Sequence, residues 1–393
     1  MRIGLVIYGS LDTLSGGYLY DRKLVEYLRA CGDRVEIISL PWRSYPRHLM
    51  DNFNPAWTRR LAALDVDVLL QDELNHPSLA WANRLFKNAP FPVVSVVHHL
   101  RTSEEHPAWL LPFYRWVERR YLASMDGFVF NSRTTQSTVE AILLKQNADS
   151  IAQYVNPSQS AQSLRQAQDT AAASAFYSSV VAYPAADHLD VPSAEAVERL
   201  IDERRVRCGP VELLFVGNLI PRKGLHYLLA ALARQPNREW RLQAVGRTDV
   251  DSRYTTRIQA QIERLGLGAS VILHGRVSDA GLAEHLSRCH LLAVPSYEGF
   301  GIVYLEAMAY SLPVIASTAG AAHEIAQESV NGFLVEPADT DRLAQTLTRC
   351  LDDRSALAGM GRAARQVYDG HPTWAETGER VRGFLVERAD YRE

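Results

Sequence analysis

A glycine-rich loop between a strand and a helix offers the first possible chemistry in this chain. The run Leu291–Val294 is apolar enough for a buried strand, and Gly299 and Gly301 follow it on either side of Phe300. Glycines let a ligand approach the main chain closely, and the first amides of the helix that starts near Ile302 have no acceptor within that helix. The loop therefore predicts a site for an anion.

Two carboxylates bracket this loop. Glu298 stands directly before it, and Glu306 falls within the helix, on the same face as Ile302 and Ala309. An unpaired charge in such an apolar stripe is costly, so Glu306 should meet hydrogen-bond donors. A nucleotide sugar would supply ribose hydroxyls for Glu306, a diphosphate for the amides and a sugar for Glu298. A solvated Glu298 beside an ordinary strand–helix turn is the plainer alternative.

The spacing E-x7-E, with G-F-G between the acids, resembles the signature of the family 4 retaining glycosyltransferases, and EGFGIVYLEAMA follows that signature without a gap. The resemblance spans nearly the whole chain and is strongest over 211–337. It implies an α/β chain with the GT-B fold: two Rossmann-like doubly wound domains that face a cleft, and a C-terminal helix that crosses back to the first domain. It also implies glycosyl transfer from a UDP- or GDP-sugar, with retention at the anomeric carbon and without a metal ion.

The pattern of strands and helices agrees with this architecture. Runs of Val and Leu, rather than alternating residues, indicate strands covered on both faces, as in a parallel sheet, and such sheets bind ligands at the carboxyl ends of their strands. We expect an acceptor-binding domain over 1–190, with a long insertion near 145–179, and a donor-binding domain over 207–370. Residues 371–393 should form the returning helix, and 191–207 the link.

His98 ends the strand PVVSVV of the expected first domain. The resemblance places a histidine at such a strand end, facing the reacting sugar, where an imidazole can donate to a hydroxyl. A pair of loop histidines bonded to the backbone is the alternative for His98 and His99. Gly16 and Gly17 precede a helix near the N-terminus and resemble the family's turn toward the acceptor or the donor phosphates. A tight strand–helix turn explains the two glycines equally well.

Cations gather at the start of the expected second domain. Gly217 ends the strand VELLFV, and Arg222 and Lys223 follow at the same edge, where they would offset the charge of a departing diphosphate. A solvated helix start is disfavoured for these cations, because they oppose the helix dipole unless an anion lies between. Many relatives place an arginine directly after this glycine, but this chain has Asn218.

The turn after the strand near Val271–Leu273 has the sequence HGRV. By resemblance, Arg276 and Val277 present main-chain groups to the nucleobase of the donor. A plain turn between a strand and a helix is an alternative that the sequence leaves open.

Aromatic and arginine residues alternate in the segment HPAWLLPFYRWVERRY, over 106–121. Rings can enter the headgroup zone of a bilayer while guanidinium groups meet phosphates, which would suit a lipid-linked acceptor and a peripheral membrane contact. We favour a core position for this segment, because its apolar residues surround the helix almost completely and Pro112 divides it.

The composition excludes several other classes. A length of 393 residues with 47% hydrophobic side chains suits two domains, and a net charge of -3 gives no electrostatic reason for nucleic-acid binding. Four dispersed cysteines without a C-x-x-C pair argue against a disulfide framework or a zinc site and fit a reducing cytoplasm. No stretch approaches about 20 uninterrupted apolar residues. We expect a cytoplasmic protein, at most peripheral at the inner face of the membrane.

Two other functions remain open. A GT-B nucleotide-sugar epimerase or hydrolase would use the donor without an acceptor, and a catalytically silent nucleotide-sugar-binding subunit would fit the loss of arginine at Asn218. A dinucleotide oxidoreductase is disfavoured because no G-x-G-x-x-G follows the first strand. We expect no cofactor, since the nucleoside diphosphate sugar is itself the donor substrate.

Overall fold

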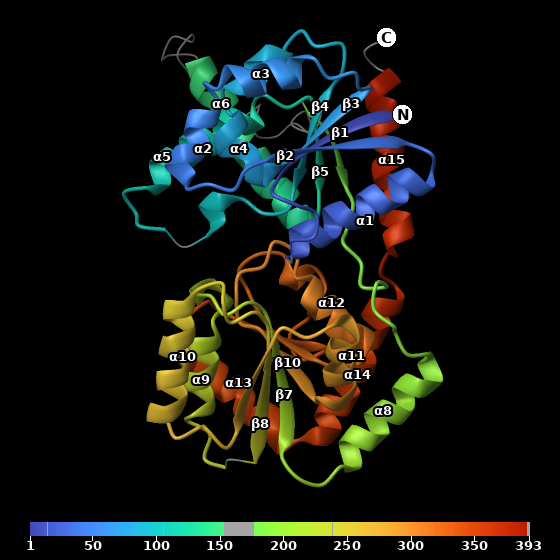
Figure 1. Ribbon diagram of the computed structural model, residues 1–393. Helices are drawn as coiled ribbons and strands as arrows, with labels where there is room; N and C mark the ends of the chain where they lie inside the picture. Colours follow the sequence, from blue (N-terminus) through green and yellow to red (C-terminus); the bar gives the residue numbers. More distant parts are fainter. Residues whose placement is uncertain (14, 105, 153–176, 238, 391–393) are drawn as a thin grey trace. The chain divides into compact units, whose positions relative to one another are not determined.

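The computed structural model describes residues 1–13, 15–104, 106–152, 177–237 and 239–390. They form two compact α/β units (Figure 1). The first unit comprises Met1–Pro184 together with Trp374–Glu393, and the second comprises Ala185–Thr373. Most of the insertion expected near 145–179 falls outside the described residues.

A six-stranded sheet forms the centre of the first unit, with every strand parallel to its neighbours in the order β2-β1-β3-β4-β5-β6. The strands are β1 (Arg2–Tyr8), β2 (Arg34–Leu40), β3 (Val68–Asp72), β4 (Val93–Val97), β5 (Gly127–Phe130) and β6 (Ser178–Val181). β3, β4 and β5 are buried along their whole length, as expected of strands covered on both faces.

The second unit repeats this plan with the strand order β12-β11-β10-β7-β8-β9. Its strands are β7 (Val211–Val216), β8 (Trp240–Val245), β9 (Val271–Gly275), β10 (Leu291–Ala293), β11 (Val314–Ser317) and β12 (Gly332–Val335), again all parallel. The predicted α/β fold with two Rossmann-like sheets is therefore confirmed. In each unit the carboxyl ends of the strands lie along one edge of the sheet, which is where open α/β sheets bind ligands.

Helices cover the faces of both sheets. In the first unit they are α1 (Gly16–Ala30), α2 (Tyr45–Asp51), α3 (Pro55–Ala62), α4 (His76–Leu79), α5 (Leu111–Leu122), α6 (Arg133–Ala152) and α15 (Trp374–Asp390), with the 3-10 turns η1 (Glu73–Asn75), η2 (Ala82–Phe86) and η3 (Arg101–Ser103). In the second unit they are α8 (Ala194–Val206), α9 (Leu225–Leu232), α10 (Ser252–Arg264), α11 (Asp279–Arg288), α12 (Ile302–Ala309), α13 (Thr340–Asp352) and α14 (Arg354–Asp369), with η5 (Pro221–Lys223) and η6 (Ala322–Glu324).

Short polar side chains fix several helix starts. The side chain of Ser15 accepts a hydrogen bond from the amide of Tyr18 at α1, and Asp251 does the same for Tyr254 at α10. Each cap satisfies one of the amides that a first helical turn leaves without a partner.

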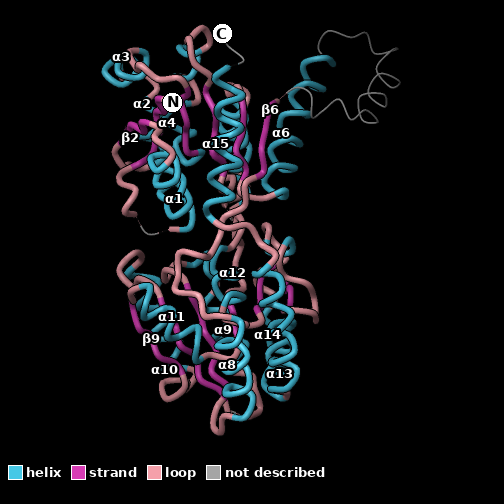
Figure 2. Tube along the Cα trace, turned by 90° about the vertical axis from the view of Figure 1, so that its right-hand side faces the viewer, coloured by secondary structure: helices cyan, strands magenta, loops and turns pink. Residues whose placement is uncertain are grey.

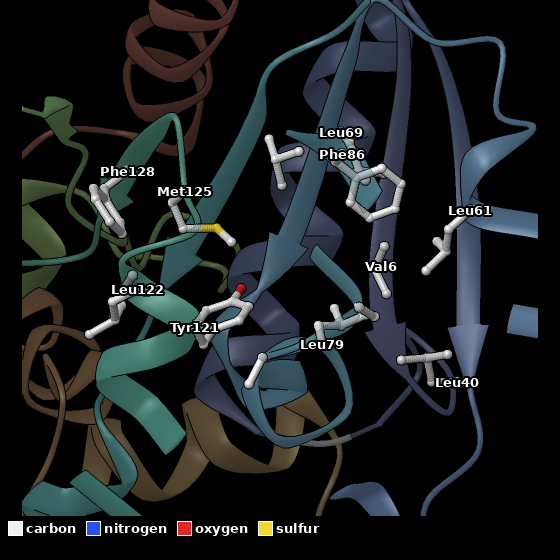
Figure 3. Close-up of a cluster of buried hydrophobic side chains, with 14 of the residues drawn as sticks. Val6, Leu40, Leu61, Leu69, Leu79, Phe86, Tyr121, Leu122, Met125 and Phe128 are labelled. Atoms are coloured by element: carbon white, nitrogen blue, oxygen red, sulfur yellow. The ribbon is translucent and has the colours of Figure 1, made fainter. Parts of the chain in front are cut away.

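One buried hydrophobic cluster packs helices against the sheet of the first unit (Figure 3). Val6 and Leu69 come from the strands, Leu79 and Phe86 from the short helical turns that follow β3, and Tyr121 from α5. This cluster fixes the positions of β3 and β4, whose last residues lead into the polar groups described below.

The C-terminal helix α15 belongs to the first unit, where it packs against α1 (Figures 1 and 2). A Cβ atom at Gly378 would lie 2.3 Å from the ring of Tyr27, so only glycine allows the two helices to come this close. Arg382 pairs with Asp33 at 2.7 Å, and Thr377 Oγ1 donates to the carbonyl of Tyr183 at 2.6 Å.

Two local expectations differ from the structure. The expected link over 191–207 contains α8 of the second unit. Pro112 lies in the first turn of α5, a position that tolerates its missing amide, and so begins this helix rather than dividing it. Among the described residues, no helix is both long and apolar enough to cross a membrane.

Candidate active site

Glycine turns line the carboxyl edge of the second sheet. Gly217 follows β7 and donates its amide to Val245 at 2.9 Å, and Gly246 follows β8 and donates to Gly275 at 2.9 Å. A Cβ atom at Gly246 would lie 2.0 Å from the carbonyl oxygen of Gly217. The main chains of neighbouring strand ends can therefore approach each other closely at this edge.

Glu298 lies at the same edge, in the loop between β10 and α12. Its Oε1 accepts from Lys223 Nζ at 2.5 Å and from Ser296 Oγ at 2.7 Å, and its side chain is 13% exposed. Arg222 Nη1 donates to the carbonyl of Tyr297 at 3.0 Å. The structure thus brings together Glu298, Arg222 and Lys223, which the sequence analysis had placed at one edge.

Charge decides the protonation state of Glu298. Burial by itself would raise the pKa of this carboxyl group, but the charges of Lys223 and Arg222 and the hydrogen bonds from Lys223 and Ser296 outweigh burial and lower the pKa below its ordinary value. Glu298 is therefore ionised near neutral pH. A negative charge at this position can stabilise positive charge that develops on a nearby group.

Two glycines with positive φ shape the main chain around Glu298. Gly320 (φ 86°) forms a parallel β-bridge with Glu298, and a Cβ atom there would lie 2.0 Å from the Glu298 carbonyl oxygen. Gly301 (φ 91°) caps α12, and a Cβ atom there would lie 2.4 Å from the ring of Tyr304. Only glycine combines these backbone angles with such close approaches.

Glu306 has a partner that the sequence analysis missed. His188 Nε2 lies 3.1 Å from Glu306 Oε1, and both side chains are nearly buried. The protein itself thus provides one of the hydrogen-bond donors that we expected for Glu306. His188 directly follows the segment YPAAD. Nothing else in the sequence indicated that this histidine would contact Glu306.

The other residues that we predicted to contact the nucleotide sugar differ in their exposure to solvent. Phe300 is buried, with its ring centroid 5.5 Å from that of His371, and Ile302 is also buried, so only their main-chain groups are suited to bind a ligand. Arg276 is exposed and Val277 is half-buried, directly after the edge strand β9. Gly299 lies between Glu298 and Phe300 in the same loop.

Another arginine lies at this edge near Asn218. The amide of Arg247 donates to Asn218 Oδ1 at 3.4 Å, and the Arg247 guanidinium pairs with Asp249 through two bonds of 2.9 Å. The sequence shows that no arginine follows Gly217, whereas the position of Arg247 after the neighbouring strand became apparent only in the structure. Arg247 lies on the same sheet edge as Arg222 and Lys223, with its charge paired to Asp249.

In the first unit, His98 lies directly after β4. Its Nε2 is 3.0 Å from Oδ1 of Asp21 in α1, and its carbonyl accepts from Asn131 Nδ2 at 2.6 Å. A Cβ atom at Gly17 would lie 3.1 Å from His98 Cδ2, which gives this glycine a packing role. Gly16 is the first residue of α1. Gly17 and His98 are therefore brought together, in a different unit from Glu298.

The acidic surroundings of His98 favour its charged form. Burial lowers its pKa, but Asp21, Asp72 and Glu73 together raise the pKa of His98 to about 9. Asp72 is fully buried, and burial and the charge of Asp21 raise its pKa well above the ordinary value. Near neutral pH His98 is therefore an imidazolium, and its Nε2 pairs with Asp21.

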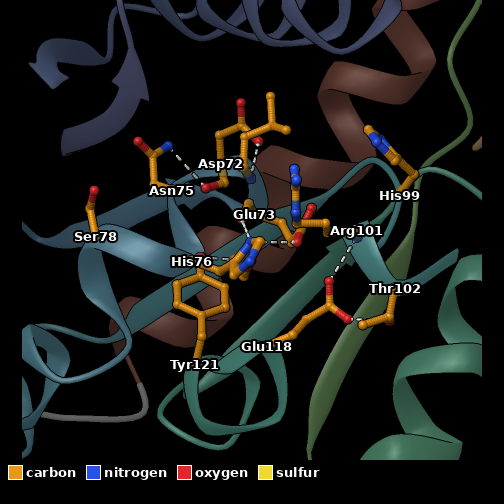
Figure 4. Close-up of polar contacts among 12 residues, drawn as sticks. Asp72, Glu73, Asn75, His76, Ser78, His99, Arg101, Thr102, Glu118 and Tyr121 are labelled. Atoms are coloured by element: carbon orange, nitrogen blue, oxygen red, sulfur yellow. Dashed lines mark hydrogen bonds and ion pairs between the residues drawn. The ribbon is translucent and has the colours of Figure 1, made fainter. Parts of the chain in front are cut away.

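A second buried polar group lies next to this one (Figure 4). His76 Nδ1 lies 3.1 Å from Glu73 Oε1, the Arg101 amide donates to Glu118 at 2.8 Å, and Thr102 Oγ1 also donates to Glu118. Burial raises the pKa values of Glu73 and Glu118 to about 7.

Two groups of side chains among the described residues have ligand atoms close enough for a metal ion, within 4.8 Å of one another. They are Asp21, Asp72 and His98, and Glu73, His76 and Glu118. Both groups lie in the first unit.

Comparisons with known proteins show which families the two units resemble. Residues 197–367 match the model of the family described as "Glycosyl transferases group 1", and residues 16–148 match a "Glycosyl transferase 4-like domain". The chain is thus glycosyltransferase-like in both units: the second resembles the group 1 glycosyl transferases, and the first resembles the 4-like domain. The predicted resemblance to glycosyltransferases is thereby confirmed.

One similar protein is the GDP-mannose-dependent monoacylated alpha-(1-6)-phosphatidylinositol monomannoside mannosyltransferase of Corynebacterium glutamicum. It is 32% identical over 181 residues, which are 42% of this chain and 45% of that protein. The chain thus spans less than half the length of this relative.

Solved structures share the whole fold of this chain. Sucrose-phosphate synthase from Thermosynechococcus elongatus superposes with a TM-score of 0.76, at 21% identity, over 100% of both chains. HepE of Anabaena, solved in complex with UDP and glucose, has a TM-score of 0.70 at 21% identity, over 98% of this chain and 100% of that one. These similarities establish the GT-B fold.

Proposed function

We propose that this protein transfers a glycosyl group from a nucleoside diphosphate sugar to a hydroxyl acceptor, with retention at the anomeric carbon. One observation carries the proposal: an ionised, largely buried Glu298 is held by Lys223 at the strand edge where α12 begins. A carboxylate, two cations and the amides of a helix start are the groups that an activated sugar diphosphate requires.

The reaction would proceed on one face of the sugar. The bond between the anomeric carbon and the diphosphate oxygen breaks, the acceptor oxygen forms the new bond, and the acceptor proton passes to the departing phosphate oxygen. Arg222 and Lys223, with the amides of Gly299–Gly301, would stabilise the negative charge of the leaving group. Glu298 would stabilise the positive charge that develops on the sugar.

Other residues would bind the rest of the donor. Glu306, already oriented by His188, would accept hydrogen bonds from the ribose hydroxyls. The turn at Arg276 and Val277 would contact the nucleobase. His98, held as an imidazolium by Asp21, would donate to a hydroxyl of the sugar.

We also propose that this chemistry needs no metal ion, because the two cations would take over the charge compensation that a metal supplies in other transferases. Treatment with EDTA followed by gel filtration should leave the transfer rate unchanged. A loss of activity that Mg²⁺ or Mn²⁺ restores would contradict this part of the proposal.

For the donor and the acceptor we propose classes of molecule and not single compounds. The GDP-mannose-dependent relative and the UDP complex of HepE support a UDP- or GDP-sugar as the donor. The phosphatidylinositol mannoside in the name of that relative supports a glycan or a lipid-linked acceptor, in cell-envelope or polysaccharide synthesis. The site of action would be the cytoplasm, including the inner surface of the membrane.

Membrane contact gains support from the segment 106–121. Its expected core position is wrong for Trp109, Phe113 and Trp116, which are exposed, and holds for Tyr114 and Val117, which are buried. Exposed aromatic rings beside arginines suit the interface of a bilayer.

Product analysis with radiolabelled UDP- and GDP-sugars tests the proposed activity. Label should move to an acceptor fraction, with release of the nucleoside diphosphate, and the new bond should keep the anomeric configuration of the donor. Label found only in free sugar or in an epimerised nucleotide sugar, with acceptor present, would show a hydrolase or an epimerase instead.

Glu298→Gln tests the assigned role of the carboxylate. We expect the donor to bind while kcat falls about 100-fold or more, since removing one electrostatic group costs this much in other enzymes. Glu284→Gln on the exposed surface of α11 serves as the matched control and should keep full turnover. A Glu298→Gln enzyme with wild-type kcat would contradict the role assigned to this carboxylate.

A further inference from the structure

A cavity of about 620 Å³ opens in the first unit, at the amino ends of β4 and β5. It lies between η2, the last turns of α5 and the loop that leads into β5. His98 follows the opposite, carboxyl end of β4. Because the five residues of β4 span roughly 16 Å, this cavity lies well away from His98 and from the strand edge assigned to catalysis.

Four cationic side chains line the cavity: Arg84, Lys87, Arg119 and Arg120. Asp126 is the one carboxylate among the described lining residues, and its Oδ2 already accepts from the amide of Val93 at 2.8 Å. The lining therefore carries a clear excess of positive charge, although the whole chain has a net charge of -3. Such a concentration of like charges favours the binding of an anion.

Among these cations, Arg120 has a hydrogen-bonding atom that no protein group satisfies. Its Nε is buried and has no hydrogen-bond partner, and its guanidinium lies 5.2 Å from the ring centroid of Trp81. Burial and the charge of Arg84 lower the pKa of Arg120 below its ordinary value. An anion in the cavity would relieve this repulsion and could accept a hydrogen bond from Arg120.

Exposed apolar side chains stand at the cavity. Trp116 lines it with 53% of its surface exposed, and Leu85 on η2 is 54% exposed. Phe113 precedes Trp116 by one turn of α5, with the ring centroids 6.2 Å apart. Phe113, Trp116 and Arg120 fall on one face of α5, so an aromatic surface leads directly to the cationic cavity.

We propose that this cavity binds the phosphate group of an acidic phospholipid, while Phe113 and Trp116 enter the headgroup layer of the bilayer. The ligand must combine an anionic phosphate with an apolar part, because the cavity supplies cations and its rim supplies rings. This lipid site rests on the membrane contact proposed above, for which an acidic phospholipid would be the lipid that is bound. It is independent of the donor site, which lies in the second unit.

Vesicle flotation with the full chain tests the proposal. The protein should float with vesicles of phosphatidylcholine and phosphatidylglycerol, and much less with phosphatidylcholine alone. The double variant Arg84→Gln/Lys87→Gln should bind the anionic vesicles about 30-fold more weakly, at roughly fivefold per charge removed near the surface. The control Arg59→Gln/Arg60→Gln removes the same charge from α3 in the same unit and should change binding less than threefold.

Three outcomes would overturn the proposal. Equal losses in the two double variants would indicate diffuse attraction rather than a site. Unchanged flotation of Arg84→Gln/Lys87→Gln would show that the cavity is not used. Binding of inorganic phosphate to the wild type that Arg84→Gln/Lys87→Gln abolishes, without flotation on anionic vesicles, would identify a free anion as the ligand.

Measuring how a nucleotide sugar binds distinguishes a failure of the proposed lipid site from a failure of the proposed transferase activity. Arg84→Gln/Lys87→Gln should keep the thermal shift that a UDP- or GDP-sugar gives with the wild type, because its changes lie in the first unit. If no nucleotide sugar shifts the wild type, the proposed transferase activity fails, while the flotation result still decides the lipid site.

Discussion

The buried pair of His98 and Asp21 shows how individual side chains set the charge at a strand end. Asp21 from α1 bonds the imidazole of His98, and Asp72 from β3 and Glu73 also raise the pKa of this imidazole. Because they hold the pKa of His98 near 9, above its ordinary 6.5, the charged form stabilises the fold. This stabilisation is complete below the pKa of the unfolded chain and is lost as the pH rises through about 9.

Asp21→Asn tests this charge arrangement. Without the Asp21 carboxylate, the pKa of His98 should fall toward or below 6.5, and the loss of stability between pH 6.5 and 9 should largely disappear. Urea denaturation midpoints measured across this interval report the change. Asp12→Asn, in an exposed loop of the same unit, should keep the wild-type dependence on pH. A variant Asp21→Asn with that same dependence would refute the assignment.

At the scale of residues, the sequence predicted the charged groups better than their partners. Glu298, Arg222 and Lys223 lie together because they follow neighbouring parallel strands, a relation that a strand pattern can reveal. Asp21 and His188 escaped notice because each comes from an element distant in sequence from its partner. Their contacts depend on the packing of α1 and of the segment after Pro184, which periodicity does not specify.

At the scale of elements, strands were easier to predict than short helices. β7 has the bounds that the apolar run VELLFV indicated. The helix α8 was taken for a link because its sequence is rich in charges. Its buried stripe contains Val197, Ile201 and Arg204, and the third of these is an arginine that donates to main-chain carbonyls, including that of Tyr310 at 2.7 Å. A charged residue within the buried stripe of a helix hides the apolar periodicity.

Gly378→Val tests how α15 completes the first unit. A side chain at this position would collide with the ring of Tyr27 and push α15 away from α1, which should lower the stability of the first unit by about 3 kcal/mol or more. Thermal unfolding followed by circular dichroism measures the loss. Gly383→Ala in the same helix has open space around its Cβ and should be neutral or slightly stabilising. Equal melting temperatures for wild type and Gly378→Val would contradict this packing.

At the scale of the whole molecule, two similar sheets carry different chemical groups at their carboxyl edges. The first unit presents an imidazolium among acids, and the second presents cations, glycine turns and an ionised glutamate. This division fits a protein in which the second unit holds the nucleotide part of the donor, since the charges there oppose those of a diphosphate. The sequence predicted this division through a family signature, whereas the cationic cavity of the first unit needed the structure, because its lining residues come from three separate segments.

Calorimetric titration with nucleoside mono- and diphosphates tests the central claim that the edge of the second sheet binds a diphosphate. For the matching base, the diphosphate should bind at least about tenfold more tightly than the monophosphate, because one further charge-assisted hydrogen bond contributes about 1.5–3 kcal/mol. In Arg222→Ala/Lys223→Ala this preference should vanish. Equal affinity for UDP and UMP and for GDP and GMP in the wild type, or a preference for the diphosphate that survives the double substitution, would contradict the account.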